Sequence, residues 1–357
     1  MKKKVTIRDV AKECGYSIFT VSSALNNRGN IKPETCEKVL AAAKKLNYNV
    51  LQNVSAVQRM RTRSIGIVLP DSGCLNNAFY NRAISTFRDA ATVHDYDCKL
   101  FTEEDISKRL GVKQPDSAHA LGCKGLIYFC PRTNYSKVID ALINQSVAVA
   151  LIRRPIPERK GLLQLVDDDR AGMMTMLNYV HHQLNCTRLA YVTGRPLAMR
   201  SKAGREIAID EFIAANQTVT AHAIIDGSLA NDPVNSEQLI QFLQAGRDAG
   251  QKTALVCWTD SDAVPAVGVA TQAGFRVPDE VCVTGYNDDP QSRNAYPGIT
   301  TMQIPVEDMV ADATRYLIDF LDDDGLPRSR VIQFQHDLIV RGSTEHNAAA
   351  TNGTRAS

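Results

Sequence analysis

The sequence predicts a small all-α N-terminal domain followed by a larger α/β body made of two doubly wound, parallel-sheet subdomains. Two observations carry this prediction. Up to residue 63 the apolar residues recur at helical spacing, whereas beyond it short β-rich runs alternate with helical stretches. The alternation occurs twice, in blocks of similar length, and strands that alternate with helices form parallel sheets covered on both faces. A ligand of such a body is expected in the crevice at the carboxyl ends of its strands.

The N-terminal segment is expected to fold as three helices within residues 5–47. Thr6 and Ser17 can cap the first two, because a hydroxyl accepts hydrogen bonds from the free N–H groups of a first turn. Gly15 separates these two short helices, and Pro33 suits the first turn of the third. The expected apolar core of this segment consists of Val10, Ala11, Val21, Ala24, Leu25, Val39, Leu40, Ala43 and Leu46.

Two short helices joined by a turn with glycine form the helix-turn-helix pattern, whose second helix enters the DNA major groove. The charge supports this interpretation. Residues 1–63 hold 13 Lys or Arg and 4 Asp or Glu, a balance of +9 in a chain whose net charge is only +2. A basic head on an acidic body favours a polyanion as the partner of the head alone. From the residues alone, a helical cap with a solvated basic face remains the alternative.

The body is expected to span residues 64–343, after a headpiece at 1–48 and a linker at 49–63. Its subdomains are predicted as about 64–163 with 292–325, and about 164–291 with 326–343, followed by a disordered tail at 344–357. The late segment 329–343 is expected to close a sheet. The expected strands are 64–70, 98–102, 125–130, 147–153, 188–194, 221–226, 253–260 and 281–288, and the expected helices are 79–93, 105–120 and 135–144.

Several classes of protein are disfavoured. The nine cysteines are scattered, odd in number and without a CxxC, which favours buried reduced thiols in a cytoplasmic protein over disulfides or zinc. No apolar stretch reaches ~18 residues and no signal peptide begins the chain, so no membrane segment is expected. No motif for a phosphate-binding loop, a catalytic serine or a metalloprotease occurs, so neither an enzyme nor a cofactor is expected. The acidic runs 167–169 and 322–324 are interpreted as helix ends rather than metal sites.

The N-terminal residues resemble the headpiece of the lactose-repressor (LacI/GalR) family of bacterial transcription regulators. The stretch "VTIRDVAKECGYSIFTVSSALNN" and the later "ETCEKVLAAAKKLNY" carry the resemblance, which continues through body segments such as "SIGIVLP", "DDRAG" and "VTGYNDD" and covers residues 4–343. It implies a homodimer whose headpieces bind a pseudo-palindromic operator in double-stranded DNA. It also implies a periplasmic-binding-protein-like body in which a small-molecule effector, of the sugar or sugar-acid class, sets the affinity for DNA. The absence of a heptad extension makes a tetramer unexpected.

The resemblance also implies the DNA contacts, and the sequence departs from the family there. Ile18 and Phe19 stand where the family carries polar residues, and Ser23 stands where arginine is common. Ile18 and Phe19 can contact thymine methyl groups, or alternatively pack on the headpiece. Val57 replaces the hinge leucine that intercalates in the minor groove, although the hinge helix is still expected to form on DNA. The expected contacts are Thr6, Arg8, Ser17, Ile18, Phe19, Thr20, Ser22, Ser23, Asn26, Asn30, Lys32, Tyr48 and Val57.

The crevice departs from the family as well. Where the family reads L-I-D-R-P the chain reads "LIRRP", so Arg153 replaces a carboxylate, and Asn287 replaces the first Asp of G-Y-D-D. Guanidinium groups favour anions, so we expect an effector with a carboxylate or phosphate, held by Arg153 and Arg205. The alternative is that Arg153 points to solvent or pairs with the carboxylates of 167–169. The expected effector contacts are Phe79, Arg153, Arg205, Trp258, Thr259, Asp260 and Asn287.

These observations predict a DNA-binding repressor controlled by a small molecule. A small-molecule binding protein or an enzyme on the same scaffold is the rival class, and a regulator that has lost effector control is a third possibility. The basic head favours the regulator, because a pure binding protein has no use for that charge.

Overall fold

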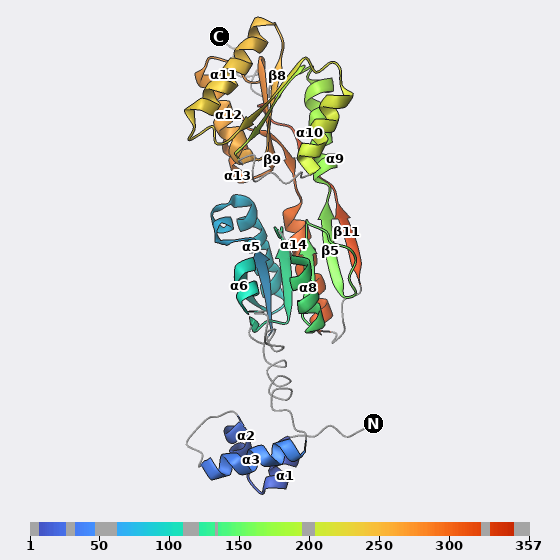
Figure 1. Cartoon of the computed structure of the whole chain (residues 1–357). Coiled ribbons are helices and arrows are strands. Elements are labelled where there is room, and N and C mark those ends of the chain that lie inside the picture. Colours follow the sequence, from blue (N-terminus) through green and yellow to red (C-terminus); the bar gives the residue numbers. More distant parts are fainter. Residues whose placement is uncertain are drawn as a thin grey trace, which may run out of the picture.

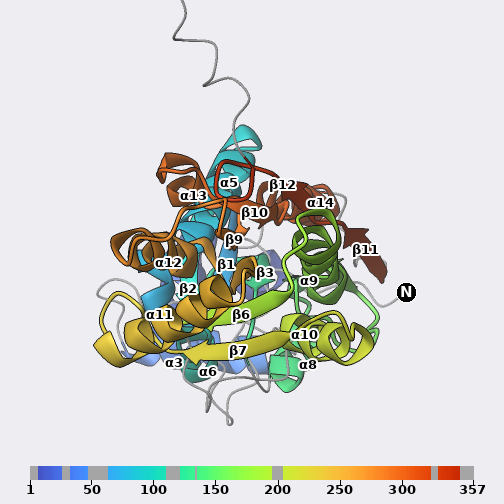
Figure 2. The same ribbon diagram turned by 90° about the horizontal axis from the view of Figure 1, so that it is seen from above.

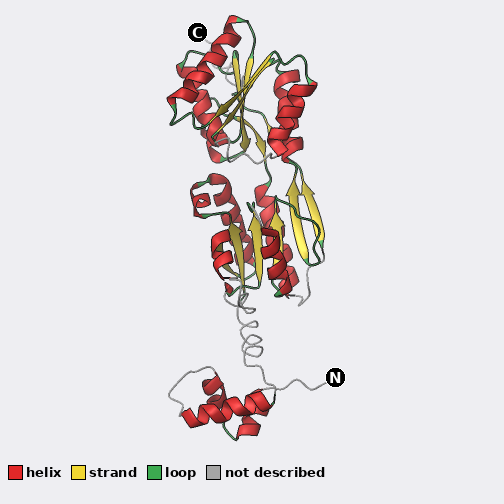
Figure 3. Cartoon of the chain, in the orientation of Figure 1, coloured by secondary structure: helices red, strands yellow, loops and turns green. Residues whose placement is uncertain are grey.

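The computed structural model describes residues 7–25, 33–46, 63–109, 121–132, 135–194, 204–322 and 329–345. Three helices form an N-terminal unit, and the remaining residues form a body of two lobes stacked end to end (Figure 1). Each lobe is a sheet with helices on both sides, as the colouring by secondary structure makes clear (Figure 3). The predicted fold class is confirmed.

The N-terminal unit consists of α1 (Ile7–Cys14), α2 (Ile18–Leu25) and α3 (Pro33–Lys45). The Ser17 hydroxyl accepts a hydrogen bond from the Thr20 N–H at 3.0 Å, which confirms Ser17 as the cap of α2. Gly15 lies in the turn with φ of 75°, a conformation that glycine adopts without strain. The core side chains are Val10, Ala11, Val21, Ala24, Val39, Ala42 and Ala43.

One residue of the predicted headpiece core lies outside it. Leu40 is 53% exposed, and the core contribution expected from it comes from Ala42 instead. The face of α3 that packs on α1 and α2 is formed at helical spacing by Val39, Ala42, Ala43 and Leu46. Leu40 lies outside this face, on the solvent side of the helix.

The first lobe contains a six-stranded parallel sheet in the order β11-β5-β4-β3-β1-β2. One face is covered by α5 (Ala78–Val93) and α14 (Val306–Asp322), and the other by α6 (Glu103–Arg109) and α8 (Tyr135–Asn144). All residues of β1, β3 and β4 are buried, as expected for parallel strands covered on both faces. The strands are β1 (Ser64–Leu69), β2 (Asp97–Thr102), β3 (Gly125–Phe129), β4 (Ala148–Ile152), β5 (Leu162–Asp167) and β11 (Arg330–Phe334), and a short helix η1 (Ser72–Asn76) precedes α5.

The second lobe repeats this plan in the order β12-β10-β9-β8-β6-β7, and only β12 is antiparallel to its neighbour. Helices α9 (Asp169–Asn178), η2 (Tyr179–Gln183) and α10 (Gly204–Ala215) lie on one face, and α11 (Pro233–Asp248) and α12 (Asp260–Gln272) on the other (Figure 2). The strands are β6 (Arg188–Thr193), β7 (Ala221–Asp226), β8 (Thr253–Cys257), β9 (Val281–Asn287), β10 (Thr300–Gln303) and β12 (Asp337–Ile339), and α13 (Pro290–Asn294) follows β9.

The C-terminal part of the body differs from the predicted division. The chain crosses between the lobes three times, after β5, after β10 and after β11. Residues 164–167 therefore belong to the first lobe and residues 292–303 to the second, contrary to the prediction, and segment 329–343 contributes one strand to each sheet. The last segment can supply both sheets because the two residues between β11 and β12 form a link from one lobe to the other instead of a hairpin turn.

The remaining differences are local. Thr344 is buried and its hydroxyl lies 3.0 Å from the Tyr179 hydroxyl, so the chain is ordered to residue 345, beyond the start of the predicted tail. The segments outside the described residues include 346–357, residues 49–62 of the predicted linker and residues 110–120 of the predicted helix 105–120. Within the described part, none of the helices combines the length and the apolarity that a bilayer crossing requires.

A pair of glycines tests the close packing of β9 on α12. A Cβ atom at Gly285 would overlap the Asp260 carboxylate and lie 3.1 Å from the Asp260 Cα, whereas Gly268 in α12 has open space around it. Gly285→Ala is expected to lower the free energy of unfolding by about 1–3 kcal/mol. Gly268→Ala is expected to raise it by about 0.5–1 kcal/mol, because alanine favours a helix interior. Equal effects of the two substitutions on urea-induced unfolding would contradict this packing.

Candidate functional site

The headpiece presents part of the predicted DNA-binding surface. Ile18 is 46% exposed on α2, and Arg8 is exposed on α1. The hydroxyls of Ser17 and Thr20 lie 2.8 Å apart and bond to one another, so Ser17 primarily fixes the start of α2. Ile18, in the first turn of α2, is not part of the headpiece core. The side chains of Phe19, Ser22 and Ser23, and residues Thr6, Asn26, Asn30, Lys32, Tyr48 and Val57, lie outside the described residues.

The body has its polar cluster at the junction of the lobes, where strands end and the chain crosses over. Cys130 after β3, Arg153 after β4 and Asn287 at the end of β9 all have positive φ, of 51°, 80° and 102°. Such conformations are uncommon for residues other than glycine and gather at ligand sites. The Arg153 N–H donates to the Leu165 carbonyl at 2.8 Å, which fixes the backbone where the side chain departs.

Two arginines and two aspartates form the centre of this cluster. Arg153 donates from Nε to Asp167 at 2.8 Å and from Nη2 to Asp169 at 2.8 Å. Arg205 donates from Nε and Nη2 to the same oxygen of Asp169, both at 3.0 Å. The structure thus brings Arg153 and Arg205 together, as predicted. It also gives Arg153 the carboxylate partners that the alternative interpretation named.

Aromatic rings cover the arginines. The Arg205 guanidinium lies 3.5 Å from the centroid of the Tyr286 ring and 4.5 Å from that of Trp258, and its Nη1 donates to the Trp258 carbonyl at 2.8 Å. The Arg153 guanidinium lies 5.5 Å from the centroid of the Phe79 ring. Phe79 and Trp258, both predicted effector contacts, therefore serve at least to orient the two cations.

His336 joins the cluster from the third crossover. Its Nε2 lies 2.8 Å from Asp167 Oδ2, and its Nδ1 lies 2.7 Å from the Tyr286 hydroxyl. Asp167, Asp169 and His336 offer donor atoms within 4.8 Å of one another, a spacing that a metal ion could use. The two carboxylates are already neutralised by guanidinium groups, so the arrangement suits ion pairing better than metal binding.

The electrostatics of the cluster follow from burial and charge. Burial alone would raise the pKa of Asp169, but Arg153 and Arg205 outweigh it and lower that pKa well below its usual value. The pKa of Asp167 is lowered in the same way, by Arg153 and by the hydrogen bond from His336. Both aspartates are therefore ionised at neutral pH, and the charges of Arg153 and Arg205 are balanced. The cluster offers paired donors and acceptors rather than an excess of positive charge.

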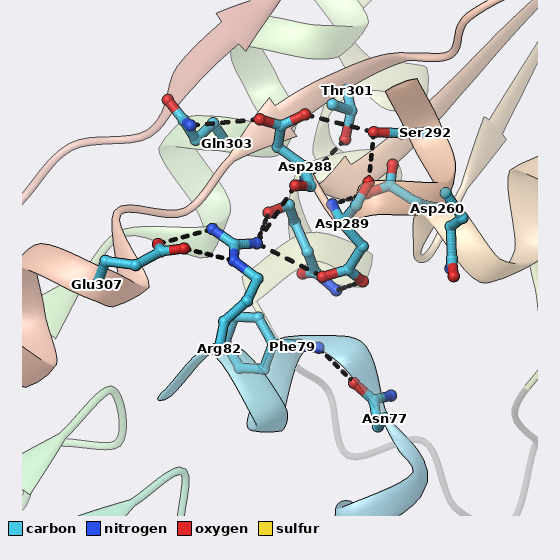
Figure 4. A network of polar contacts seen from close by, with 12 residues as sticks. Asn77, Phe79, Arg82, Asp260, Asp288, Asp289, Ser292, Thr301, Gln303 and Glu307 are labelled. Atoms are coloured by element: carbon cyan, nitrogen blue, oxygen red, sulfur yellow. Dashed lines mark hydrogen bonds and ion pairs between the residues drawn. The ribbon is translucent and has the colours of Figure 1, made fainter. Parts of the chain in front are cut away.

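A second polar network at the junction of the lobes surrounds Arg82 (Figure 4). Arg82, on α5 of the first lobe, makes a two-pronged ion pair with Glu307 at the start of α14, at 2.6 and 2.7 Å. Its Nη1 also donates to the Asn287 carbonyl at 2.8 Å, in the second lobe. Nothing in the sequence pattern singled out Arg82, although it lies one helical turn from Phe79 on the same helix.

The other predicted effector contacts are engaged in local structure. The Thr259 hydroxyl donates to Asp262 at 2.8 Å and caps α12, and the Asn287 amide lies 3.4 Å from Asp289. Asp260 is fully buried, and its Oδ2 accepts the Asp289 N–H at 2.7 Å. Burial, together with the neighbouring carboxylates of Asp289 and Asp288, raises the pKa of Asp260 to about 7. These residues shape the second lobe's side of the junction instead of projecting free groups into it.

The sequence did not identify several members of the junction. Tyr286 lies near the end of the buried strand β9, and Asp288 and Asp289 follow that strand. Side chains at such a strand end can reach a ligand, and this position was the available signal. His336 lies in a two-residue link between short strands, and no local pattern distinguishes it.

A separate cavity of about 220 Å³ lies under α10 in the second lobe, lined mostly by apolar residues of β6, β7 and α10.

Comparison with known proteins places these features in context. Residues 6–50 match the family described as bacterial regulatory proteins, lacI family, and residues 181–344 match a periplasmic binding protein-like domain. The chain is 27% identical over 349 residues to the HTH-type transcriptional regulator RegA of Clostridium saccharobutylicum, covering 95% of this chain and 99% of that protein. It is 25% identical to the catabolite control protein A of Staphylococcus xylosus, covering 96% and 99%.

Solved structures have the same fold. A complex of the transcriptional regulator CelR with cellobiose aligns with a TM-score of 0.61 at 20% identity, covering 95% of this chain and all of that one. The lac repressor dimer bound to operator and an anti-inducer aligns with a TM-score of 0.59 at 20% identity, covering 96% and 99%. Both likenesses include the headpiece as well as the body, because they extend over nearly the whole chain.

The buried Asp260 predicts a pH dependence of stability. Its pKa rises from ~3.9 in the unfolded chain to about 7 in the folded one. Between these values the folded state holds a proton that the unfolded state has released, so stability falls as pH rises from 4 to 7. Asp260→Asn removes this slope, and its stability relative to the native chain should increase by up to roughly 4 kcal/mol between pH 4 and pH 7. Asp89→Asn, at an exposed aspartate of α5, is the control. Parallel pH profiles for all three proteins in urea unfolding would contradict the prediction.

Proposed function

The chain belongs to the lacI family of bacterial regulatory proteins, and from that membership we propose that it is a transcriptional repressor controlled by a small molecule. The observation that carries the proposal is the helix-turn-helix unit, with Ile18 of α2 exposed, in a chain that also contains a two-lobed body with a polar junction. Its relatives named above are transcription regulators, and we infer no catalytic activity. A cytoplasmic location follows from that role.

We propose that two copies act together. A helix-turn-helix unit recognises one half-site, and a symmetric dimer places two such units on a pseudo-palindromic operator at a fixed spacing. The lac repressor structure named above is a dimer on its operator, which supports the same arrangement here. The effector would change the relative orientation of the lobes, and therefore the spacing of the two headpieces.

The effector is proposed to bind at the lobe junction beside Arg153 and Arg205. Both guanidiniums are paired with Asp169, so an anionic ligand would have to compete with a carboxylate already in place. A neutral polyhydroxyl compound can instead share the donors and acceptors of these pairs and stack on the ring of Trp258. We therefore propose a neutral sugar or polyol as the first candidate. An anionic sugar derivative is the second candidate, favoured by the presence of two arginines.

Exposed apolar residues of the headpiece test the DNA-binding function. Oligonucleotides retained by the chain from a random pool would define its site. Ile18→Ala should then weaken binding to that site by up to roughly 60-fold, because it removes three carbon atoms and each one withdrawn from an apolar contact is worth about 0.8 kcal/mol. Leu40→Ala, at an apolar residue of α3 that is 53% exposed, is the matched control and should leave binding unchanged. The function is refuted if no oligonucleotide is preferred over competitor at low salt, with or without candidate effectors.

The effector class is tested by thermal unfolding with panels of neutral sugars, sugar acids and sugar phosphates. The first candidate predicts a rise in Tm with one or more neutral compounds. Arg205→Lys keeps the charge but loses the guanidinium fork, so it should abolish that rise. Arg170→Lys, at an exposed arginine paired with Glu211, should retain it. A rise only with sugar acids or phosphates would favour the second candidate over the first.

A further inference from the structure

Arg82 contacts both lobes at the side of the junction formed by α5 and the loop after β9. In the first lobe, its Nε and Nη2 bind the two oxygens of Glu307 at 2.6 and 2.7 Å. In the second lobe, its Nη1 lies 2.8 Å from the Asn287 carbonyl, 3.3 Å from the Asp288 carbonyl and 3.5 Å from Asp289 Oδ1. One side chain thus donates hydrogen bonds to acceptors in both lobes (Figure 4).

The acceptors of the second lobe are held in place independently of Arg82. The Asp288 carboxylate is bound by Arg341 at 2.6 Å and by Arg293, both from the second lobe. The Asp289 N–H donates to Asp260 at 2.7 Å. Asn287 and Asp288 both have positive φ. The direction of their carbonyl groups is therefore set by contacts within the second lobe and does not depend on Arg82. They form a preorganised site for one guanidinium group.

The cation and its partners in the second lobe are largely withdrawn from water, whereas the side chain of Glu307 is 48% exposed. The Arg82 side chain is 15% exposed and that of Asp289 is 3% exposed. Loss of the contacts to residues 287–289 would remove the Arg82 donor from two carbonyls and leave the Asp289 carboxylate with the bond from the Asn287 amide at 3.4 Å. Removal of one partner from a buried charged pair is costly. Separation of the lobes on this side would therefore carry an energetic penalty in the absence of any ligand.

We infer that Arg82 is an internal ligand of the lobe junction: it occupies a guanidinium site on residues 287–289 and holds the lobes together without an effector. The effector would then act on a junction that is already closed, and its binding would either keep or break the bonds of Arg82 to the second lobe. This regulatory consequence rests on the proposed effector control, whereas the closing contact itself does not. The rival explanation is that Arg82 serves only to pair with Glu307 inside the first lobe.

The test measures the distance between the lobes in the full-length chain without DNA or effector. Spin labels are placed through non-natural amino acids, because the chain has nine native cysteines. The label sites are Lys137 on α8 and Gln241 on α11, which are exposed residues on outer helices of the two lobes. Arg82→Gln should shift the distance distribution away from that of the native chain and broaden it. Arg88→Gln, at an exposed arginine of the same helix that pairs only with its neighbour Asp89 among the described contacts, should leave the distribution unchanged.

A second comparison separates the two explanations. Arg82→Ala leaves the acceptors in place, so millimolar methylguanidinium should restore the native distribution in this variant and have no effect on Arg88→Gln. Distributions for Arg82→Gln and Arg82→Ala that superimpose on that of Arg88→Gln would overturn the inference and leave Arg82 as a partner of Glu307 alone. If Arg82→Gln fails to fold, Arg82→Lys, which keeps the charge and loses the fork, is measured in its place with the same criterion. DNA selection with the native chain decides the proposed function separately, since the distance measurement contains no DNA.

Discussion

The junction of the two lobes depends on one carboxylate. Asp169 is the first residue of α9, directly after the first crossover, and it accepts hydrogen bonds from Arg153 of the first lobe and Arg205 of the second. Without it, Arg153 would keep Asp167 as its partner, whereas Arg205 would lose the carboxylate partner that the described contacts give it. Its position on the crossover means that the chain itself carries the neutralising charge into the place where the lobes meet. The stacked rings and the hydrogen bond of His336 to Asp167 are arranged around this balance.

The balance changes the chemistry that the junction offers. Two arginines in an otherwise apolar crevice would attract anions, whereas two arginines paired with two aspartates present alternating donors and acceptors with little net charge. Elsewhere at the junction, Arg82 fulfils the equivalent role for the acceptors of residues 287–289. The two lobes are thus joined by three crossovers and by two sets of charge-assisted hydrogen bonds.

The sequence predicted the fold well because the signals for it are local. The hydroxyl cap at Ser17, the glycine turn and the helical spacing of Val21 and Val39 define the headpiece, and continuous apolar runs mark the buried parallel strands. The division of the C-terminal segment failed because a short strand carries no mark of the sheet that it will join. Strand β10, with the sequence TTMQ, has only one apolar residue, and strand β11, with RVIQF, has a short pattern that does not distinguish the two sheets.

The site was predicted less completely, for a related reason. Arg153 was identified through a departure from the family pattern and Arg205 through a match to it, and the structure brings them together. Their shared partner Asp169 was named only as an alternative, because sequence spacing does not reveal which of two opposite charges a guanidinium will meet across a junction. Arg82 and His336 reach the site from elements that are distant in the sequence, so only the tertiary structure identifies them.

The central claim is that a small molecule at the lobe junction controls the affinity of the headpiece for DNA. The most direct measurement is the affinity of the chain for its selected oligonucleotide, with and without the compound that most raises its Tm, together with the affinity for that compound with and without the oligonucleotide. The account predicts that both affinities change by the same factor, as thermodynamic linkage requires. An affinity for DNA that is identical at zero and saturating compound would contradict it.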